Sequence, residues 1–252
     1  MCLILFAYKV HPIYNLIVAA NRDEFYNRAT APVHFWEDVP GILAGRDLEK
    51  HGTWMGVTKQ GRFSALTNFR DPNESTEGKR SRGELVASAL TYPDHMEDYL
   101  QTLSNKRLHY PGYNLLAGSQ DELYYYSNVA NKLEEIVPGV HGVSNHFLNT
   151  NWPKVDKGKQ ELEKSLHLKK ENLVDQLFSI LNCADPFPDE QLPKTGVPLG
   201  WERMLSSLFI KSEDYGTRSS TVLLMSDQQI DLVESVHTQN GNRKEQTYRI
   251  NL

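Results

Sequence analysis

The residue with the clearest potential for chemistry is the cysteine at position 2. A small side chain at this position permits removal of the initiator Met1, which would leave Cys2 with both a thiol and a free α-amino group. An α-amine has an ordinary pKa of about 7.7 to 8.0 and a thiol one of about 8.5, so the amine can serve as the base that activates the thiol. Cys2 is therefore a candidate nucleophile. The alternative is a small apolar residue at the start of a buried strand.

Four consecutive polar residues, Asn21-Arg22-Asp23-Glu24, are expected to lie beside Cys2. Two apolar runs separated by a break with Pro12 predict a β-hairpin, whose antiparallel pairing brings this segment next to Cys2. An arginine such as Arg22 would stabilise a thiolate, and a carboxylate such as Asp23 would orient the α-amine. The alternative is a polar strand end that makes surface ion pairs of little energetic value.

Three further polar residues stand at the ends of expected strands. Asn68 and Asn145 each follow an apolar run, and either could donate a hydrogen bond to a developing oxyanion. Arg218 precedes another apolar run. Taken singly, each residue is more typical of a turn or a surface charge. The residue pattern alone does not bring them together.

Composition excludes several classes of function. With 252 residues and 39% hydrophobic content, the chain can bury a sizeable core, and we expect one domain over residues 1–252. A net charge of -5 argues against nucleic acid as a partner. No stretch approaches the ~20 apolar residues that cross a bilayer, so no transmembrane segment is expected. Two cysteines fit free thiols in a reducing compartment, which favours a cytoplasmic location.

The sequence lacks the common cofactor and metal motifs. It contains no Gly-rich dinucleotide or phosphate loop, no His-Glu-x-x-His, no Cys-x-x-Cys and no Gly-x-Ser-x-Gly. His141 and His146 lie five residues apart without Cys or carboxylate neighbours, which is poor geometry for a metal. We therefore expect neither a metal nor an organic cofactor.

The elements that must position these residues are mostly strands. Strands are predicted over residues 2–8, 15–20, 41–44, 53–58, 62–68, 113–118, 122–128, 139–145, 219–226, 230–237 and 246–250. Helices are predicted over residues 83–90, 96–103, 153–166 and 172–182. Strands at both ends with helices between them favour a layered α+β fold. Residues 70–82 and 185–200 are expected to be surface loops, either of which could act as a lid.

Short blocks along the whole chain resemble the transport and Golgi organisation protein 2 family, also called the NRDE family. These blocks are the N-terminal Met-Cys, Ala19-Ala20-Asn21-Arg22-Asp23-Glu24-Phe25, Gly52-Thr53-Trp54, Ala65-Leu66-Thr67-Asn68, Arg82-Gly83-Glu84-Leu85, Tyr113-Asn114-Leu115, Val143-Ser144-Asn145 and Tyr215-Gly216-Thr217-Arg218. That family is similar to the N-terminal-nucleophile hydrolases. The resemblance implies a four-layer αββα sandwich, with two antiparallel sheets between helical layers.

The same resemblance implies a set of site residues. Bile salt hydrolases and penicillin V acylases use an N-terminal Cys, an Arg and an Asp after the second strand, two Asn residues and a later Arg. Similar positions here are Cys2, Arg22, Asp23, Asn68, Asn145 and Arg218. In those acylases two residues separate the Arg from the Asp, a spacing that Asn21 and Glu24 have instead. We assign Arg22 and Asp23 by charge type.

The implied activity is that of a cysteine amidase acting on a linear C–N amide bond. The Cys2 thiolate would attack the carbonyl carbon, while the Asn145 side chain and the Asn68 backbone N–H would hold the oxyanion. Two rivals remain: a binding or trafficking protein for haem or for acyl-CoA and lipid ligands, and a thioesterase with the same nucleophile. The hydrolase interpretation predicts that Met1 is removed and that the site residues, with Asn21 and Glu24, converge on one pocket.

Overall fold

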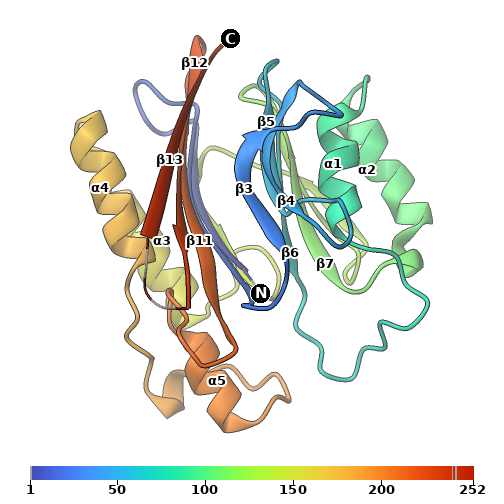
Figure 1. Cartoon of the computed structure of the whole chain (residues 1–252), viewed down its shortest axis with the longest axis vertical. Coiled ribbons are helices and arrows are strands. Elements are labelled where there is room, and N and C mark those ends of the chain that lie inside the picture. The colour runs from blue at the N-terminus through green and yellow to red at the C-terminus, as the bar shows by residue number, and fades with distance from the viewer. Residues whose placement is uncertain (1, 240, 242) are drawn as a thin grey trace.

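Two antiparallel β-sheets stack face to face in the computed structural model, which describes residues 2–239, 241 and 243–252 (Figure 1). Among these residues, one sheet has six strands in the spatial order β10-β1-β2-β11-β12-β13. The other has seven, in the order β3-β4-β5-β6-β7-β8-β9. The predicted removal of Met1 concerns a residue outside this description and stays a prediction.

The strands and helices have the following residue ranges. The six-stranded sheet contains β1 (Cys2–Tyr8), β2 (Leu16–Phe25), β10 (Gly139–Val143), β11 (Tyr215–Met225), β12 (Gln229–His237) and β13 (Arg243–Asn251). The seven-stranded sheet contains β3 (Thr30–Phe35), β4 (Ile42–Asp47), β5 (Met55–Thr58), β6 (Phe63–Asn68), β7 (Tyr113–Gly118), β8 (Leu123–Ser127) and β9 (Lys132–Glu135). The helices are α1 (Gly83–Thr91), α2 (Met96–Asn105), α3 (Pro153–Ser165), α4 (Lys170–Leu181) and α5 (Leu199–Ser206).

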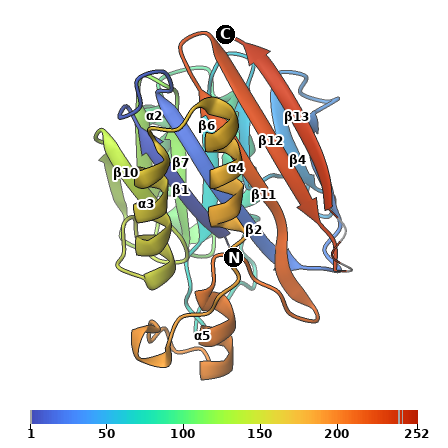
Figure 2. The same ribbon diagram turned by 90° about the vertical axis from the view of Figure 1, so that its left-hand side faces the viewer.

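Helices cover the outer face of each sheet. Figure 2 shows α3 and α4 lying across the six-stranded sheet, and Figure 1 shows α1 and α2 on the far side of the seven-stranded sheet. One apolar cluster fills the space between the sheets, and two others join each sheet to its helices. The expected four-layer α+β sandwich is therefore confirmed. No helix within the described residues is long and apolar enough to span a membrane.

Burial on both faces explains why apolar and polar residues do not alternate along β1. All seven of its residues are buried. Leu3 and Leu5 pack among residues of α3 and α4, whereas Ile4 and Phe6 belong to the cluster between the sheets. A strand covered on both faces gains from apolar side chains at every position. The N-terminal run is thus an interior strand of a sheet that is covered on both faces.

Every predicted strand and helix is present, but several ends differ. β2 extends to Phe25 and β11 begins at Tyr215, and these extensions pair with each other. The sequence analysis missed β3, β9 and α5. β3 was missed because it contains Pro32, and β9 because it is the charged segment Lys132–Glu135. α5 was missed because it follows Pro198 and begins in the proline-rich residues 185–200, which were expected to be a loop. Residues 70–82 form a loop as expected.

Candidate active site

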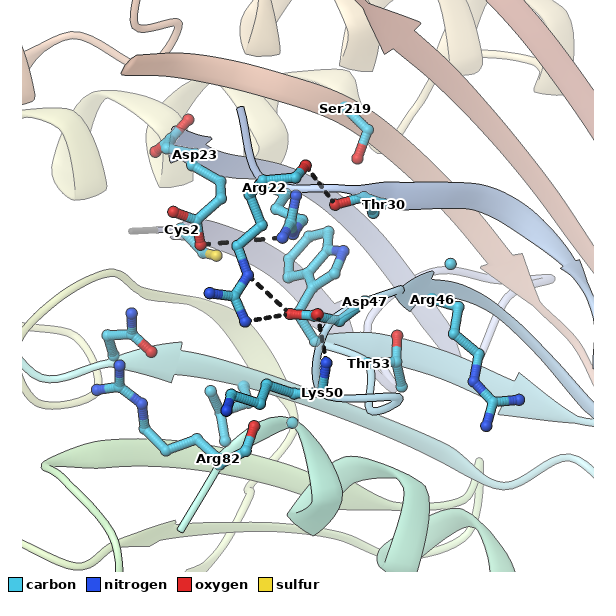
Figure 3. A pocket seen from close by; sticks show the side chains of 18 of the residues that line it. Cys2, Arg22, Asp23, Thr30, Arg46, Asp47, Lys50, Thr53, Arg82 and Ser219 are labelled. Atoms are coloured by element: carbon cyan, nitrogen blue, oxygen red, sulfur yellow. Dashed lines mark hydrogen bonds and ion pairs between the residues drawn. The ribbon is translucent and has the colours of Figure 1, made fainter. Parts of the chain in front are cut away.

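Cys2 lines a cavity of about 600 Å³ whose walls come from both sheets (Figure 3). The β1–β2 register places Cys2 opposite Arg22, as the hairpin prediction required. Cys2 is only 7% exposed. Burial raises the pKa of its thiol, the negative charge of Asp23 raises it further, and the positive charge of Arg22 lowers it. Arg22 is therefore positioned to favour the thiolate against the effect of burial.

The guanidinium of Arg22 does not use all of its hydrogen-bond donors. Its Nη2 lies 3.9 Å from Glu24 Oε2, beyond hydrogen-bond distance, and its buried Nη1 has no hydrogen-bond partner among the described residues. A buried guanidinium nitrogen without a partner carries a desolvation cost. A ligand atom that accepts this hydrogen bond would remove the cost.

Asp23 also lines the cavity, at the end of β2 beside Cys2. Thr217 donates its hydroxyl hydrogen to Asp23 Oδ1 at 2.7 Å. Burial raises the pKa of this carboxyl, and the positive charge of Lys154 lowers it. Figure 3 shows Arg22 and Asp23 on the same side of the cavity, next to Cys2. A carboxylate in this place is suited to hold an amine at position 2.

The structure bears on which pair faces the Cys2 thiol, Arg22 and Asp23 or Asn21 and Glu24. Asn21 is fully buried and donates to the carbonyls of Leu181 and Leu208, both at 2.8 Å, so it serves the contact between the sheet and its helices. Glu24 does line the cavity, together with Arg22 and Asp23. Glu24 therefore faces the cavity that Cys2 lines, and Asn21 does not.

Asn68 lines the cavity, whereas Asn145 lies just behind it. Asn145 is fully buried, and its Nδ2 donates to the backbone oxygen of Asn68 at 3.0 Å. The neighbouring Ser144 hydroxyl donates to the Cys2 carbonyl oxygen at 3.0 Å. Asn145 is not among the residues that line the cavity. The segment after β10 thus connects the two walls on which Cys2 and Asn68 stand.

The Arg218 side chain does not reach this cavity. The register of β2 and β11 shifts between Thr217 and Ser219, so Arg218 occupies a β-bulge. Its Nη1 donates to the carbonyls of Phe25, at 2.7 Å, and Arg28, at 3.1 Å. Arg218 is therefore not part of the cavity lining, because the bulge turns its side chain toward the β2–β3 turn. Asn21 points to the helical side of its sheet, whereas Asn145 contacts the cavity-lining Asn68 from behind.

The cavity is lined by many charged residues, of which the sequence analysis selected only Arg22, Asp23 and Glu24. Its basic residues are Arg22, Arg28, Arg46, Lys50, Lys79, Arg80 and Arg82, and its acidic residues are Asp23, Glu24, Asp47 and Glu234. Several of them come from the 70–82 loop. The block Arg82-Gly83-Glu84-Leu85 was noted only as a family signature. Its place at the start of a predicted helix gave no sign of the cavity.

A second group of charges is buried next to Cys2 on the helical side. Lys154, 2% exposed at the start of α3, donates from Nζ to the carbonyl of Leu205 at 3.0 Å. Burial lowers its pKa to about 8, although the charge of Asp23 raises it. Arg70 and Glu202 form an ion pair of 2.7 Å in the same region. Cys2 and Asp23 therefore lie between the charged cavity and a second, buried group of charges.

Within the part of the chain that the structure describes, no group of three or more His, Cys, Asp or Glu side chains could hold an ion.

Comparison with known proteins gives the family. The model of the Transport and Golgi organisation 2 family matches residues 1–239. The chain belongs to this family. The mouse Transport and Golgi organization 2 homolog is 36% identical over 248 residues, which cover 89% of this chain and 88% of the mouse protein. The Drosophila melanogaster Transport and Golgi organization protein 2 is 31% identical, with 94% of this chain and 93% of that protein covered.

The fold of this Transport and Golgi organisation 2 family member is similar to that of a solved structure. The Caenorhabditis elegans N-acylethanolamine-hydrolyzing acid amidase ortholog superimposes with a TM-score of 0.51 over 88% of this chain and 92% of its own. The identity is 11%. The likeness therefore concerns the fold, which is of the N-terminal-nucleophile hydrolase type.

Proposed function

We propose that this protein is a cysteine amidohydrolase that cleaves a linear C–N amide bond with the Cys2 thiol as nucleophile. The observation that carries the proposal is the position of Cys2 at the start of β1, opposite Arg22 in the wall of a 600 Å³ cavity that also contains Asp23 and Asn68. A cavity of this size accommodates a small organic substrate. The fold likeness to an amidase supports the choice of bond.

In the proposed first step the α-amine of Cys2, freed by removal of Met1, takes the proton of the thiol. The sulfur forms a bond to the substrate carbonyl carbon, and the carbonyl oxygen becomes an oxyanion. The C–N bond then breaks, and the leaving amine takes the proton from the α-ammonium. Water, deprotonated by the same α-amine, attacks the thioester and releases a carboxylic acid and the free thiol.

The proposed oxyanion donors are the Asn68 backbone N–H and the Asn145 side-chain amide. Asn145 Nδ2 carries two hydrogens, and the bond to the Asn68 carbonyl uses one of them. In the same proposal Arg22 favours the thiolate and Asp23 holds the α-amine, while Arg218 fixes the turn beside them. Lys154 sets the charge environment of Asp23.

Intact-mass spectrometry tests this function directly. The purified protein is exposed in parallel to a panel of amides and acyl thioesters, and the mass of one acyl group on Cys2 is the expected result. A Cys183→Ala variant should keep the adduct and a Cys2→Ala variant should lose it. Adducts from thioesters alone would favour a thioesterase. An adduct that maps to Cys183 would refute the proposal.

A binding function without turnover is the second candidate, because the relatives' names refer to transport and Golgi organisation. Haem and acyl-CoA or lipid ligands stay predictions under this candidate. Titration of each ligand into Cys2→Ala protein would give saturable binding, with no covalent adduct on the native protein.

A further inference from the structure

The cations that line the cavity differ in how far they are neutralised. Five of them have carboxylate partners: Arg28 with Asp47 at 2.7 Å, Lys79 with Glu74 at 2.9 Å, Arg80 with Glu84 at 2.7 Å, Arg46 with Asp38, and, at the longer distance of 3.9 Å, Arg22 with Glu24. Arg82 and Lys50 have no carboxylate ion-pair partner in the described part of the chain. Unmatched positive charge in a cavity wall favours an anionic ligand.

Arg82 is the more constrained of these two cations. It is half-buried, and its Nη1 donates to the carbonyl of Gly112 at 3.0 Å. This contact uses one of the five N–H hydrogens of a guanidinium. Burial lowers the pKa of Arg82, whereas the charges of Glu74 and Cys2 raise it. The side chain thus has donors available at a fixed place in the cavity.

The backbone around Arg82 is fixed by close packing. Thr53 N donates to the carbonyl oxygen of Gly83 at 3.1 Å, and a Cβ atom at Gly52 would lie 2.5 Å from the carbonyl carbon of Gly83. The β4–β5 loop, which carries Lys50, therefore packs directly against the start of α1. Figure 3 shows Lys50 and Arg82 on the wall across from Arg22 and Asp23, with Cys2 beside Arg22 and Asp23.

We propose that the substrate carries an anionic group close to its scissile amide, and that Arg82, assisted by Lys50, binds this group. The inference rests on the proposed function and deepens it. A guanidinium fits a carboxylate or a phosphate through two parallel hydrogen bonds, which an uncharged amide cannot form. The substrate class is therefore an acidic amide, such as an N-acyl amino acid or the N-acyl derivative of a phosphorylated amine.

Binding to protein that cannot turn over tests the anion site. The Cys2→Ala protein is titrated calorimetrically with N-octanoylglycine, N-octanoylphosphoethanolamine and the neutral N-octanoylglycinamide. At least one anionic probe should bind about 10- to 100-fold more tightly than the neutral probe. The anionic probe that binds more tightly identifies a carboxylate or a phosphate.

Adding Arg82→Gln should remove most of that preference, and Arg82→Lys should retain part of it. Arg80→Gln is the matched control, because it removes a cation of the same loop whose charge Glu84 already neutralises and whose side chain is 57% exposed. It should leave the preference within about twofold, as expected for a surface ion pair. Should Arg82→Gln fail to fold, Lys50→Gln and the comparison of probes on the parent protein decide the question.

The outcomes separate this inference from the proposed function. Equal affinity for the three probes, no binding of any, or a preference unchanged by Arg82→Gln would overturn the anion site. Arg82-dependent binding without acylation of Cys2 in native protein would keep the anion site and refute the amidohydrolase. Efficient cleavage of N-octanoylglycinamide, with no gain for the charged probes, would keep the amidohydrolase and refute the anion site.

Discussion

At the residue scale, the thiol of Cys2 is the feature on which the chemistry depends. Cys2→Ala should abolish acyl transfer, because no other nucleophile adjoins the α-amine of residue 2. The melting temperature should change little, since the substitution removes one sulfur atom, whereas truncation of a large core side chain costs ~2 to 5 kcal/mol. Activity and thermal melting, measured together on both proteins, check this. Full activity of Cys2→Ala on a genuine substrate would contradict the assignment.

Asn145 is expected to act on turnover and not on the reactivity of the thiol. Asn145→Ala removes the proposed oxyanion donor, which typically lowers turnover ~10²- to 10³-fold. It also removes the bond to the Asn68 carbonyl, with a loss of ~1 kcal/mol in folding stability. Iodoacetamide should still label Cys2 in the variant. An unchanged kcat at unchanged stability would exclude Asn145 from the mechanism.

The effect of Arg22 on the thiol should appear in the pH profile of alkylation. Burial raises the pKa of Cys2, so the rate of iodoacetamide labelling should rise with pH to a midpoint above that of a free thiol. Arg22 lowers this pKa, so Arg22→Gln should move the midpoint to still higher pH. Peptide mass mapping would separate Cys2 from Cys183. A midpoint that moves to lower pH would show that Arg22 does not act on the thiolate.

At the element scale, the contact between the β4–β5 loop and α1 should tolerate no extra atom. Gly52→Ala places a Cβ 2.5 Å from the backbone of Gly83, and overpacking of this kind costs ~1 to 3 kcal/mol. The matched control is Gly200→Ala in α5, where nothing lies within 4 Å of the added atom. We expect a lower denaturant midpoint for Gly52→Ala, and an equal or higher one for Gly200→Ala. Equal stability of both variants would contradict the close packing.

At the scale of the whole molecule, Lys154 should make stability depend on pH. Its pKa is about 8 in the folded protein, against an ordinary value of about 10.4, so the unfolded chain binds this proton more tightly. Its contribution to stability is therefore least favourable below pH 8, and improves by up to about 3 kcal/mol as pH rises to about 10.

Lys154→Met removes this titration while it preserves much of the side-chain length. Melting temperatures at pH 7 and pH 10 would reveal the effect, with wild type gaining relative to the variant at the higher pH. A difference that stays constant between the two pH values would mean that Lys154 is not buried as a cation.

The sequence predicted the layers of the molecule better than the details of the site. The continuous apolar run of β1 indicated a buried strand, and the hairpin placed Cys2 beside Arg22 as the structure does. The direction of Arg218 could not be predicted, because it depends on a bulge between strands far apart in sequence. Arg82 was missed because its role depends on which carboxylates neutralise its neighbours, which only the folded chain determines.

The hydrogen bond from Ser144 to the Cys2 carbonyl has a further consequence for the chain end. The first residues of a domain usually fray, and ordering one residue costs ~1 to 2 kcal/mol of conformational entropy. Here the backbone of Cys2 is held by pairing with β2 and by the hydroxyl beyond β10. A terminus created at Cys2 would already be immobile, so cleavage of one peptide bond would yield a preorganised reagent without any refolding.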